Sequence, residues 1–420
     1  GTITNLDGNF SLKVPANATV VISYIGMKTQ EIAIKGKSKI DVTLSDDAKA
    51  LDEVVVIGYG TAKRKDITGS VASVNSETLA AIPVASATEA LQGKMAGVQI
   101  TTTEGSPDAQ MSIRVRGGGS ITQSNEPLFI VDGFPVESIS DIPPTDIESI
   151  DVLKDASSTA IYGARGANGV IIVTTKSGKE GKVSVSYNAY YAWKKVAKTL
   201  DVLSASDYTK WQYELAQLTN KNDDYIKYFG NYQDLDMYDN VATNDWQDLT
   251  FGRTGHSFNH NLSINGGSDK FKYSFSYSHI DDKAIMQMSD YARDNLNLKL
   301  NHKPLKNVSL DFSARFSKTK INGGGSNDAN SSLNTDKRLK YSLLYTPYPV
   351  PGISDALNAD EEDANSLLIN PLISLRDNDT RKERINYNLA GSITWEIIKD
   401  LKLKAEVGYD DYRNNADRYY

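Results

Sequence analysis

The glycines at positions 163, 166 and 169 are the first residues of this 420-residue chain whose spacing suggests chemistry. Glycine-rich turns can bind phosphate through their backbone N–H groups, but only where they follow a strand and begin a helix. Here the run GARGANG (163–169) follows a helical stretch and precedes a β-branched strand at 170–175. This order is the reverse of a nucleotide-binding turn. We therefore expect these glycines to allow close backbone packing and not to bind a nucleotide.

Ser317 and Lys320 have the S-x-x-K spacing of enzymes in which a lysine activates a serine nucleophile. That chemistry needs a helix that aims the serine, whereas the residues before Ser317 alternate between apolar and polar side chains, as in a strand. The pair is therefore predicted to lie where a strand enters a polar loop. The chain has no cysteine, which excludes a thiol nucleophile and a cysteine-ligated zinc site. We expect no enzymatic activity.

The four histidines, His256, His260, His279 and His302, are scattered along the chain. His256 and His260 fall on one face of a predicted strand, but a metal site needs a third ligand, and none lies near them in the sequence. His260 interrupts an otherwise apolar face. We expect it to lie near a strand end, in the headgroup region of a membrane.

Residues 223–245 combine acidic and tyrosine side chains. The acids are Asp223, Asp224, Asp234, Asp236, Asp239 and Asp245, and the tyrosines are Tyr225, Tyr228, Tyr232 and Tyr238. The spacing does not match an EF-hand loop and lacks its closing glutamate. We expect a solvated external loop and no cofactor. Calcium binding by the acids and glycan contact through the four tyrosines are the alternatives.

The composition narrows the class of protein. At 40% hydrophobic and 24% charged residues, the chain can form two or three domains with a sizeable core. A net charge of −7 argues against a nucleic-acid partner. No apolar run reaches the about 18 residues that a membrane-spanning helix needs. The strands of a β-barrel give a much weaker hydropathy signal, so a membrane location stays open.

From Val183 onward the chain repeats amphipathic strands, about seven in all. Apolar side chains recur at every second position: Phe271, Tyr273, Phe275 and Tyr277; Val308, Leu310, Phe312, Ala314 and Phe316; Ile385, Tyr387, Leu389, Ile393, Trp395 and Ile397; and Leu401, Leu403, Ala405, Val407 and Tyr409. This alternation fits a soluble β-sandwich and a transmembrane barrel equally well.

The connections between these strands favour the barrel. The links at 266–270, 303–307 and 399–400 are tight turns, whereas those at 194–257, 279–294 and 317–384 are longer. Short turns on one side and long loops on the other are typical of outer-membrane barrels.

Residues 1–44 contain the pattern of a few short strands. Asp7-Gly8 is a turn dipeptide, segments 20–25 and 30–34 suggest a hairpin around Gly26, and apolar residues alternate over 40–44. Four strands are too few to close a β-sandwich. We therefore expect the first strands of this domain, and a secretory signal, to lie upstream of Gly1.

Three segments resemble one protein family and occur in its order. They are LDEVVVIGYGTAKR (51–64), IRVRGGGSITQSNEPLFIVDGFPV (113–136) and IESIDVLKDASSTAIYGARGANGVIIVTTK (147–176). All three resemble the SusC/RagA branch of the TonB-dependent outer-membrane transporters.

The resemblance implies a mainly β fold with four parts. These are the end of a carboxypeptidase-regulatory-like β-sandwich (1–45), a linker with a TonB-box-like strand (46–62), a small α/β plug domain (63–180) and the first strands of an antiparallel transmembrane β-barrel with long external loops (181–420). Barrels of this family have 22 strands. We therefore expect the chain to be a fragment.

The resemblance also implies which residues matter. The TonB box falls on Asp52, Glu53, Val54, Val55, Val56 and Ile57, whose backbone would pair with an exposed sheet edge of the partner. The plug motifs fall on Arg114, Arg116, Gly117, Asp132, Gly133, Lys154, Asp155, Tyr162, Gly163, Arg165, Gly166, Asn168 and Gly169. We expect a hairpin turn at Asp132-Gly133, a helix N-cap at Asp155, and ion pairs from Arg114 and Arg116 to acids of the barrel wall.

The function implied by the resemblance is TonB-dependent import across the outer membrane of a Gram-negative bacterium. The cargo would be an oligosaccharide or a peptide, a SusD-like surface lipoprotein would act as a lid, and TonB would supply the energy from the periplasm. The sandwich, TonB box and plug would lie on the periplasmic side. Two alternatives are a surface receptor, signal transducer or adhesin on the same scaffold, and a soluble β-rich carbohydrate-binding accessory protein.

Overall fold

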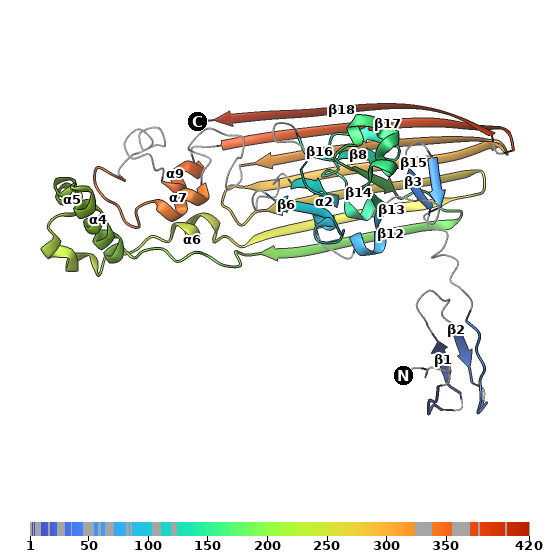
Figure 1. Ribbon diagram of the computed structural model, residues 1–420, viewed down its shortest axis with the longest axis horizontal. Helices are drawn as coiled ribbons and strands as arrows, with labels where there is room; N and C mark the ends of the chain where they lie inside the picture. The colour runs from blue at the N-terminus through green and yellow to red at the C-terminus, as the bar shows by residue number, and fades with distance from the viewer. Residues whose placement is uncertain are drawn as a thin grey trace. The chain divides into compact units, whose positions relative to one another are not determined.

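The computed structural model describes residues 2, 4, 10–15, 17–22, 30–34, 36–44, 54–57, 60–63, 71–80, 84, 86–102, 111–118, 124–323, 338–354, 370–376, 379–399 and 401–419. The chain forms two compact units, Gly1–Ser70 and Val71–Tyr420. Figure 1 colours them from blue at the N-terminus to red at the C-terminus.

The first unit contains two short hairpins. β1 (Thr19–Ile22) pairs antiparallel with β2 (Gln30–Ala33), in agreement with the hairpin predicted around Gly26. β3 (Val54–Ile57) pairs antiparallel with β4 (Gly60–Lys63). Residues 40–44 lie outside any strand despite their alternation. This stretch contacts β2 through a side chain, since Gln30 Nε2 donates to the Thr43 carbonyl at 2.9 Å. The turn predicted at Asp7-Gly8 lies outside the described residues.

An α/β domain begins the second unit and is built on a five-stranded sheet in the order β5-β10-β11-β8-β9. Its strands are β5 (Val71–Asn75), β8 (Leu128–Val131), β9 (Phe134–Val136), β10 (Ile147–Leu153) and β11 (Val170–Thr175). β11 runs parallel to β8, and the other neighbours are antiparallel. β11 is buried on both faces, as its run of apolar β-branched residues predicts, and β10 is buried from Ile150 to Leu153.

Short helices and a second hairpin complete this domain. They are α1 (Ser76–Ala80), α2 (Ala87–Leu91), η2 (Pro144–Asp146), α3 (Ala156–Thr159), η3 (Ala160–Gly166) and the hairpin of β6 (Val98–Thr102) with β7 (Met111–Val115). Leu79, Ala87 and Leu91 pack on the sheet residues Ile150 and Val152 to form the core.

The N-terminal caps of α2 and α3 differ from each other. Ser86 Oγ accepts a hydrogen bond from the Glu89 amide at 3.2 Å and so begins α2. Asp155 lies at the N-cap of α3, as predicted, but its side chain makes no capping hydrogen bond. Its carboxylate instead pairs with Arg116.

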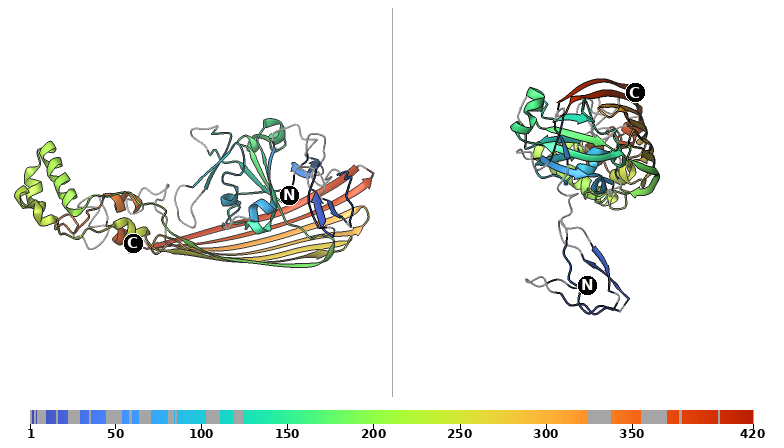
Figure 2. Two further views of the ribbon diagram at one scale, coloured as in Figure 1. Left: turned by 90° about the horizontal axis from the view of Figure 1, so that it is seen from below. Right: turned by 90° about the vertical axis from the view of Figure 1, so that its right-hand side faces the viewer.

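Seven antiparallel strands form the rest of the second unit, in chain order from one edge to the other. They are β12 (Gly181–Lys194), β13 (Gly255–Gly267), β14 (Phe271–Lys283), β15 (Asp290–Leu305), β16 (Val308–Asn322), β17 (Asp379–Ile398) and β18 (Leu401–Tyr419). We call this sheet the strand wall. The number of strands confirms the prediction, and Figure 2 shows the α/β domain against one face of the wall.

The strands are longer than the apolar alternation predicts. The link between β14 and β15 covers residues 284–289, whereas the sequence suggested a loop over 279–294. The prediction was wrong because the outward residues of these strand ends are charged: Asp281, Lys283, Asp290 and Asp294. Charged residues carry no apolar signal, although their backbones continue the ladder.

The two long links contain helices that the sequence did not reveal. They are α4 (Ala205–Thr219), α5 (Asn222–Phe229), η4 (Tyr232–Tyr238), α6 (Trp246–Phe251), α7 (Arg338–Leu344) and α9 (Pro371–Arg376). Figure 1 shows them beyond the end of the wall that lies opposite the tight turns. Within the described ranges, no helix combines the length and apolar character needed to cross a bilayer.

Candidate functional site

The face of the strand wall that meets the α/β domain is lined with small neutral polar side chains. Ser274, Ser276, Ser278, Asn295 and Asn297 are all at most 7% exposed. Such side chains can exchange hydrogen bonds between a neighbouring protein surface and water at little net cost. The interface is therefore hydrophilic, unlike the core of the α/β domain.

Asp132 makes the first charged contact across this interface. It lies in the two-residue turn between β8 and β9, where Asp132 (φ 50°) and Gly133 (φ 93°) both adopt left-handed conformations, as a tight hairpin requires. Its carboxylate accepts hydrogen bonds from Thr175 N (2.9 Å) and Thr175 Oγ1 (2.6 Å). Lys299 Nζ of β15 lies 3.0 Å from Asp132 Oδ1, and both side chains are at most 15% exposed.

The environment of Asp132 favours its ionised form. Burial alone would raise the pKa of its carboxyl group. The positive charges of Lys299 and Arg315 and the hydrogen bonds from Thr175 outweigh burial and lower the pKa below its ordinary value of 3.8. The hairpin tip is therefore held to the wall by an ionised pair.

Asp146 makes the second contact, at the end of η2, and is 5% exposed. Ser276 Oγ donates to Asp146 Oδ2 at 2.8 Å, and Asn261 Nδ2 lies 3.4 Å from Oδ1. Burial raises the pKa of this carboxyl group above 3.8. The two neutral donors and the charges of Lys176 and Arg293 offset burial only in part.

Backbone groups and one aromatic ring add to the interface. Arg293 Nη1 donates to the Ser140 carbonyl at 2.8 Å. The Phe134 ring, at the start of β9, lies against Gly408 of β18, where a Cβ atom would clash with the ring. Glycine at 408 therefore makes room for this contact.

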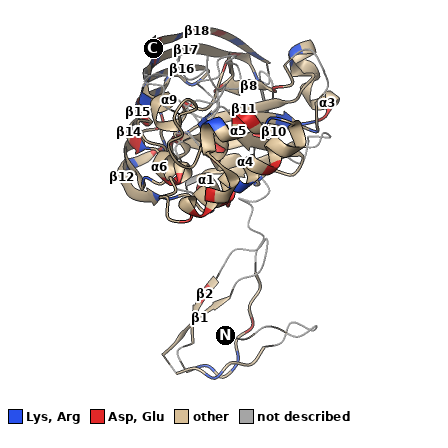
Figure 3. Ribbon diagram, turned by 90° about the vertical axis from the view of Figure 1, so that its left-hand side faces the viewer, with Lys and Arg blue, Asp and Glu red and all other residues tan. Residues whose placement is uncertain are grey.

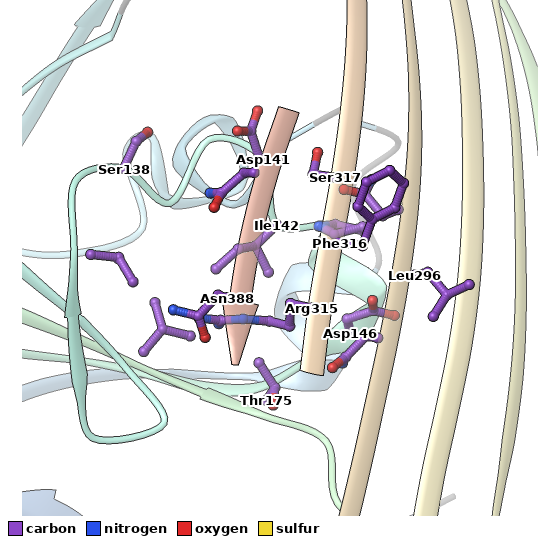
Figure 4. A pocket seen from close by; sticks show the side chains of 16 residues that line it. Ser138, Asp141, Ile142, Asp146, Thr175, Leu296, Arg315, Phe316, Ser317 and Asn388 are labelled. Carbon is purple, nitrogen blue, oxygen red and sulfur yellow. The ribbon is translucent and has the colours of Figure 1, made fainter. Parts of the chain in front are cut away.

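A cavity of about 40 Å³ lies between these contacts. Figure 4 shows Asp146, Thr175 and Arg315 around it. Asn297 Oδ1, Arg315 Nη1 and Asn386 Oδ1 are buried polar atoms that have no hydrogen-bond partner among the described residues, and all three residues line the cavity. Donors and acceptors around a space of this size suit about one or two ordered waters.

Two parts of the chain match known protein domains. Residues 63–170 match the TonB-dependent receptor plug domain, and residues 1–56 match the CarboxypepD_reg-like domain. The chain is 40% identical to the TonB-dependent receptor SusC of Bacteroides thetaiotaomicron over 303 residues, or 70% of this chain and 28% of the relative. It is 34% identical to the TonB-dependent receptor P3 of Formosa agariphila over 433 residues, or 100% of this chain and 40% of the relative.

A solved structure agrees in fold. The RagAB peptide importer in its open-open state superposes with a TM-score of 0.69 and 28% sequence identity, over 87% of this chain and 43% of the importer chain. The chain belongs to the SusC/RagA branch of the TonB-dependent receptors. It spans 28% to 40% of the length of the two curated relatives. The α/β domain is the plug, and the strand wall is part of the barrel.

The plug motifs contact one another more than they contact the wall. Arg116 pairs with Asp155, Lys154 donates to the Ala96 carbonyl, and Asn168 Nδ2 donates to the Ser124 carbonyl at 3.1 Å. These bonds join the beginning of α3 to the residue after β7, the end of β10 to the segment before β6, and the glycine-rich segment to the segment before β8. The sequence predicts ion pairs from Arg114 and Arg116 to acids of the barrel wall. In the structure Arg116 pairs with Asp155 of the plug itself. The ion pair described between plug and wall has the opposite polarity, with the acid Asp132 on the plug and Lys299 on the wall.

The glycine-rich segment packs as a structural unit. Gly169 has φ 90°, and a Cβ atom there would come within 2.9 Å of Val115. Gly166 is buried, Tyr162 is half-buried, and Gly163 and Arg165 are exposed. Gly117 follows β7 with φ 102°. The segment lies on the plug and not at the beginning of a long helix, so its role as a packing element stays the better interpretation.

The TonB-box-like segment is only partly described. Val54, Val55, Val56 and Ile57 form β3, and Asp52 and Glu53 lie outside the described residues. β3 pairs with β4 along one edge. Within the described part of the first unit, no strand pairs with its other edge. The segment has the extended backbone that pairing with another protein requires.

The four loop tyrosines have different environments. Tyr225 is 4% exposed and packs with Phe229 and Tyr348 in a small core of the helical loops. Tyr238 OH donates to the Phe229 carbonyl at 2.9 Å, and Tyr228 is half-buried. Tyr232 is 52% exposed and stacks on Tyr213 with ring centroids 4.1 Å apart. Of these four rings, Tyr232 is the one most accessible to a ligand.

The remaining candidate groups lie apart. Ser317 faces the plug and is 7% exposed, whereas Lys320 is exposed on the opposite face of β16, so the two cannot act together. Figure 3 marks the acidic positions in red as seen from the loop end. Among the residues that the structure describes, no group of three or more histidine or acidic side chains could hold a metal ion.

Proposed function

We propose that the complete protein is a TonB-dependent importer of the outer membrane of a Gram-negative bacterium. The observation that supports this most is the hydrophilic contact between the plug and the wall. A plug held mostly by polar contacts, among them those of Ser276 and Asn261, the Arg293–Ser140 hydrogen bond and the Asp132–Lys299 ion pair, can leave the wall if water replaces those hydrogen bonds. Each hydrogen bond contributes only about 0.5–1.5 kcal/mol net. A plug held by apolar side chains would lose its burial energy on leaving.

The proposed cycle uses the chain's own elements in order. Ligand binds on the loop side, above the plug. TonB captures residues 52–57 in the periplasm by pairing with the free edge of β3. Force on this strand then moves plug residues away from the wall and opens a path for the ligand.

The partners and cargo are part of the proposal. We propose an oligosaccharide as cargo, since exposed tyrosines such as Tyr232 suit sugar stacking. A peptide is the alternative, since the related RagAB structure is that of a peptide importer. A SusD-like lipoprotein would cover the loop side. Purification of the complete receptor from membranes with its bound lipoprotein and ligand, followed by their identification by mass spectrometry, would test all three.

The import mechanism is tested by blocking the backbone of β3 in the complete protein. Val55→Pro and Val56→Pro each remove one backbone N–H, and adjacent N–H groups point to opposite strand edges. At least one variant should reduce uptake to background while surface binding of the ligand persists. Val55→Thr and Val56→Thr keep the backbone groups and should import normally. Undiminished uptake in both proline variants would overturn the mechanism.

A further inference from the structure

The plug side of the strand wall carries an excess of positive charge. Cross-strand pairing places its residues in four rows, each with one residue from each of β14 to β18. From the turn side to the loop side, the rows are Ser274, Lys299, Ser313, Ala390 and Gly408; Ser276, Asn297, Arg315, Asn388 and Asp410; Ser278, Asn295, Ser317, Asn386 and Tyr412; and Ile280, Arg293, Thr319, Arg384 and Asn414. The acidic member is Asp410, and the basic members, which we call the wall cations, are Lys299, Arg315, Arg293 and Arg384.

The plug presents carboxylates to the wall cations. Asp132 Oδ1 lies 3.0 Å from Lys299 Nζ, and the positive charge of Arg315 acts on the same carboxylate. Arg293 and Arg384 line a second cavity of about 280 Å³ between the wall and the plug. The plug side of this cavity is lined by four acidic residues, which are Glu89, Glu126, Glu137 and Asp141. The acidic side of the interface is therefore the movable plug, and the basic side is the wall.

Arg315 has the capacity to bind a further anionic group. Its Nη1 atom is buried and has no hydrogen-bond partner among the described residues. The side chain lines the cavity of about 40 Å³, where Figure 4 shows it beside Asn388. A guanidinium group offers five N–H donors in a planar arrangement that matches the oxygens of a carboxylate or of a tetrahedral oxyanion. Because a buried donor without an acceptor is costly, an anionic group that reached Arg315 would be bound favourably.

The wall cations follow one another from the loop side toward the turn side. Arg293 lies near the start of β15 and Arg384 near the start of β17, and both strands begin at loop links. Arg315 lies two rows further from the loops, and Lys299 lies one row beyond Arg315. Successive rows are about 7 Å apart, because residues on one face of a strand alternate with a rise of about 3.3–3.4 Å per residue. Positive charges about 7–14 Å apart along the strands can bind one chain molecule at several points.

We propose that the cargo is an acidic oligosaccharide, and that its carboxylate or sulfate groups bind the wall cations when the plug carboxylates leave them. This rests on the proposed import of an oligosaccharide and names its class. Each anionic group that replaces a plug carboxylate keeps a wall cation compensated, so plug release costs less with this cargo than with a neutral sugar. The serine hydroxyl and asparagine amide groups between the wall cations suit the many hydroxyl groups of a sugar chain.

Sucrose octasulfate and sucrose are suitable probes, because they share one sugar and differ in charge. Isothermal titration calorimetry of the complete receptor should detect binding of the octasulfate and none of sucrose, and the binding should weaken at higher salt. Arg293→Gln and Arg384→Gln should each weaken it about tenfold. Lys318→Gln removes a cation from the opposite face of β16 and is the matched control, which should bind as the wild type does. Absence of octasulfate binding, or equal binding by all variants, would overturn the inference.

Competition between the plug and the anion is a separate test. Asp132→Asn removes the carboxylate that faces Lys299 and should strengthen octasulfate binding several-fold. In the wild type, the octasulfate should accelerate hydrogen exchange of amides in 128–136, whereas amides in 170–175, in the core of the plug, should exchange as before. If Asp132→Asn binds no better and exchange in 128–136 does not change, the plug carboxylate and the anion do not compete, and the inference is wrong.

The cargo itself gives the last test. The ligand that is purified with the complete receptor and identified by mass spectrometry should be an oligosaccharide with carboxylate or sulfate groups. A neutral oligosaccharide or a peptide would overturn this inference, while the import mechanism tested through β3 would stand. Undiminished uptake in both proline variants of β3 would instead overturn the import mechanism, and the calorimetric results with the octasulfate would not change.

Discussion

Asp132 and Asp146 are both buried plug carboxylates that contact the wall, yet the cost of burying them is offset by different groups. Asp132 faces Lys299 at 3.0 Å and keeps a lowered pKa. Asp146 is contacted by the neutral donors Ser276 and Asn261 and has a raised pKa. A buried carboxylate that is paired with an opposite charge is costly to separate from its partner. A buried carboxylate that has only neutral donors has a less favourable free energy in the buried site than in water. We infer that Asp132 holds the plug and that Asp146 favours its release.

The largest expected effect is that of Asp132→Ala. Removal of this carboxylate leaves Lys299 buried without its partner, at a cost of about 3–5 kcal/mol to plug docking. Hydrogen exchange of amides in 128–136 of the complete receptor should accelerate by about two to four orders of magnitude. An exchange rate unchanged from wild type would show that the pair contributes nothing to docking.

A double-mutant cycle separates the pair from its burial. Lys299→Met alone should also weaken docking, because it leaves the Asp132 carboxylate buried among fewer charges. Asp132→Asn combined with Lys299→Met should recover much of the loss, with a coupling energy of about 1–3 kcal/mol. Additive effects in the same exchange assay would mean that the two side chains act independently.

For Asp146 we expect the opposite sign. Asp146→Asn keeps the shape and removes the ionisable group, and its amide can donate to Ser276 Oγ. Docking should strengthen by about 1 kcal/mol at neutral pH, seen as slower exchange of amides in 144–147. Faster exchange would contradict the inference that Asp146 favours release.

The two carboxylates also predict opposite pH dependences. The docked pKa of Asp146 is raised, so docking should weaken as pH rises from 3.8 through that pKa, and Asp146→Asn should remove this step. The docked pKa of Asp132 is lowered, so its contribution should persist above 3.8 and be lost as pH falls through the docked pKa. Exchange profiles of 128–136 and 144–147 between pH 3 and 7 measure both, and parallel profiles would refute the contrast.

The smallest expected effect is that of Ser276→Ala. Loss of the 2.8 Å hydrogen bond should weaken docking by about 0.5–1.5 kcal/mol at neutral pH, where Asp146 needs a donor. Near pH 4 the loss should be smaller because the carboxyl group is then more protonated. Ser274→Ala, on the same face of β14, is the control. An equal effect of the two alanines would mean that Asp146 does not depend on Ser276.

The sequence predicts local features better than contacts across the interface. The turn at Asp132-Gly133 and the strand at 170–175 follow from residue types next to one another in the chain. The contacts of Asp146 cannot be predicted in this way, because Asn261 and Ser276 lie 115 and 130 positions away. Both also belong to residue types that are common on any polar strand face. The helices of the loops were missed because most of them are short, and the many polar residues and tyrosines of 223–245 also suit a solvated loop.

Strand β5 has a mechanical consequence through its place in the plug sheet. It is the first described strand of the plug and lies at the sheet edge, joined to β10 through five residue pairs from Ser149–Asn75 to Leu153–Val71. β11, in contrast, is joined on both sides. A pulling force applied to the chain before Val71 would act first on the hydrogen bonds between β5 and β10. The plug can therefore lengthen by the separation of this one edge strand while β8 to β11 stay paired.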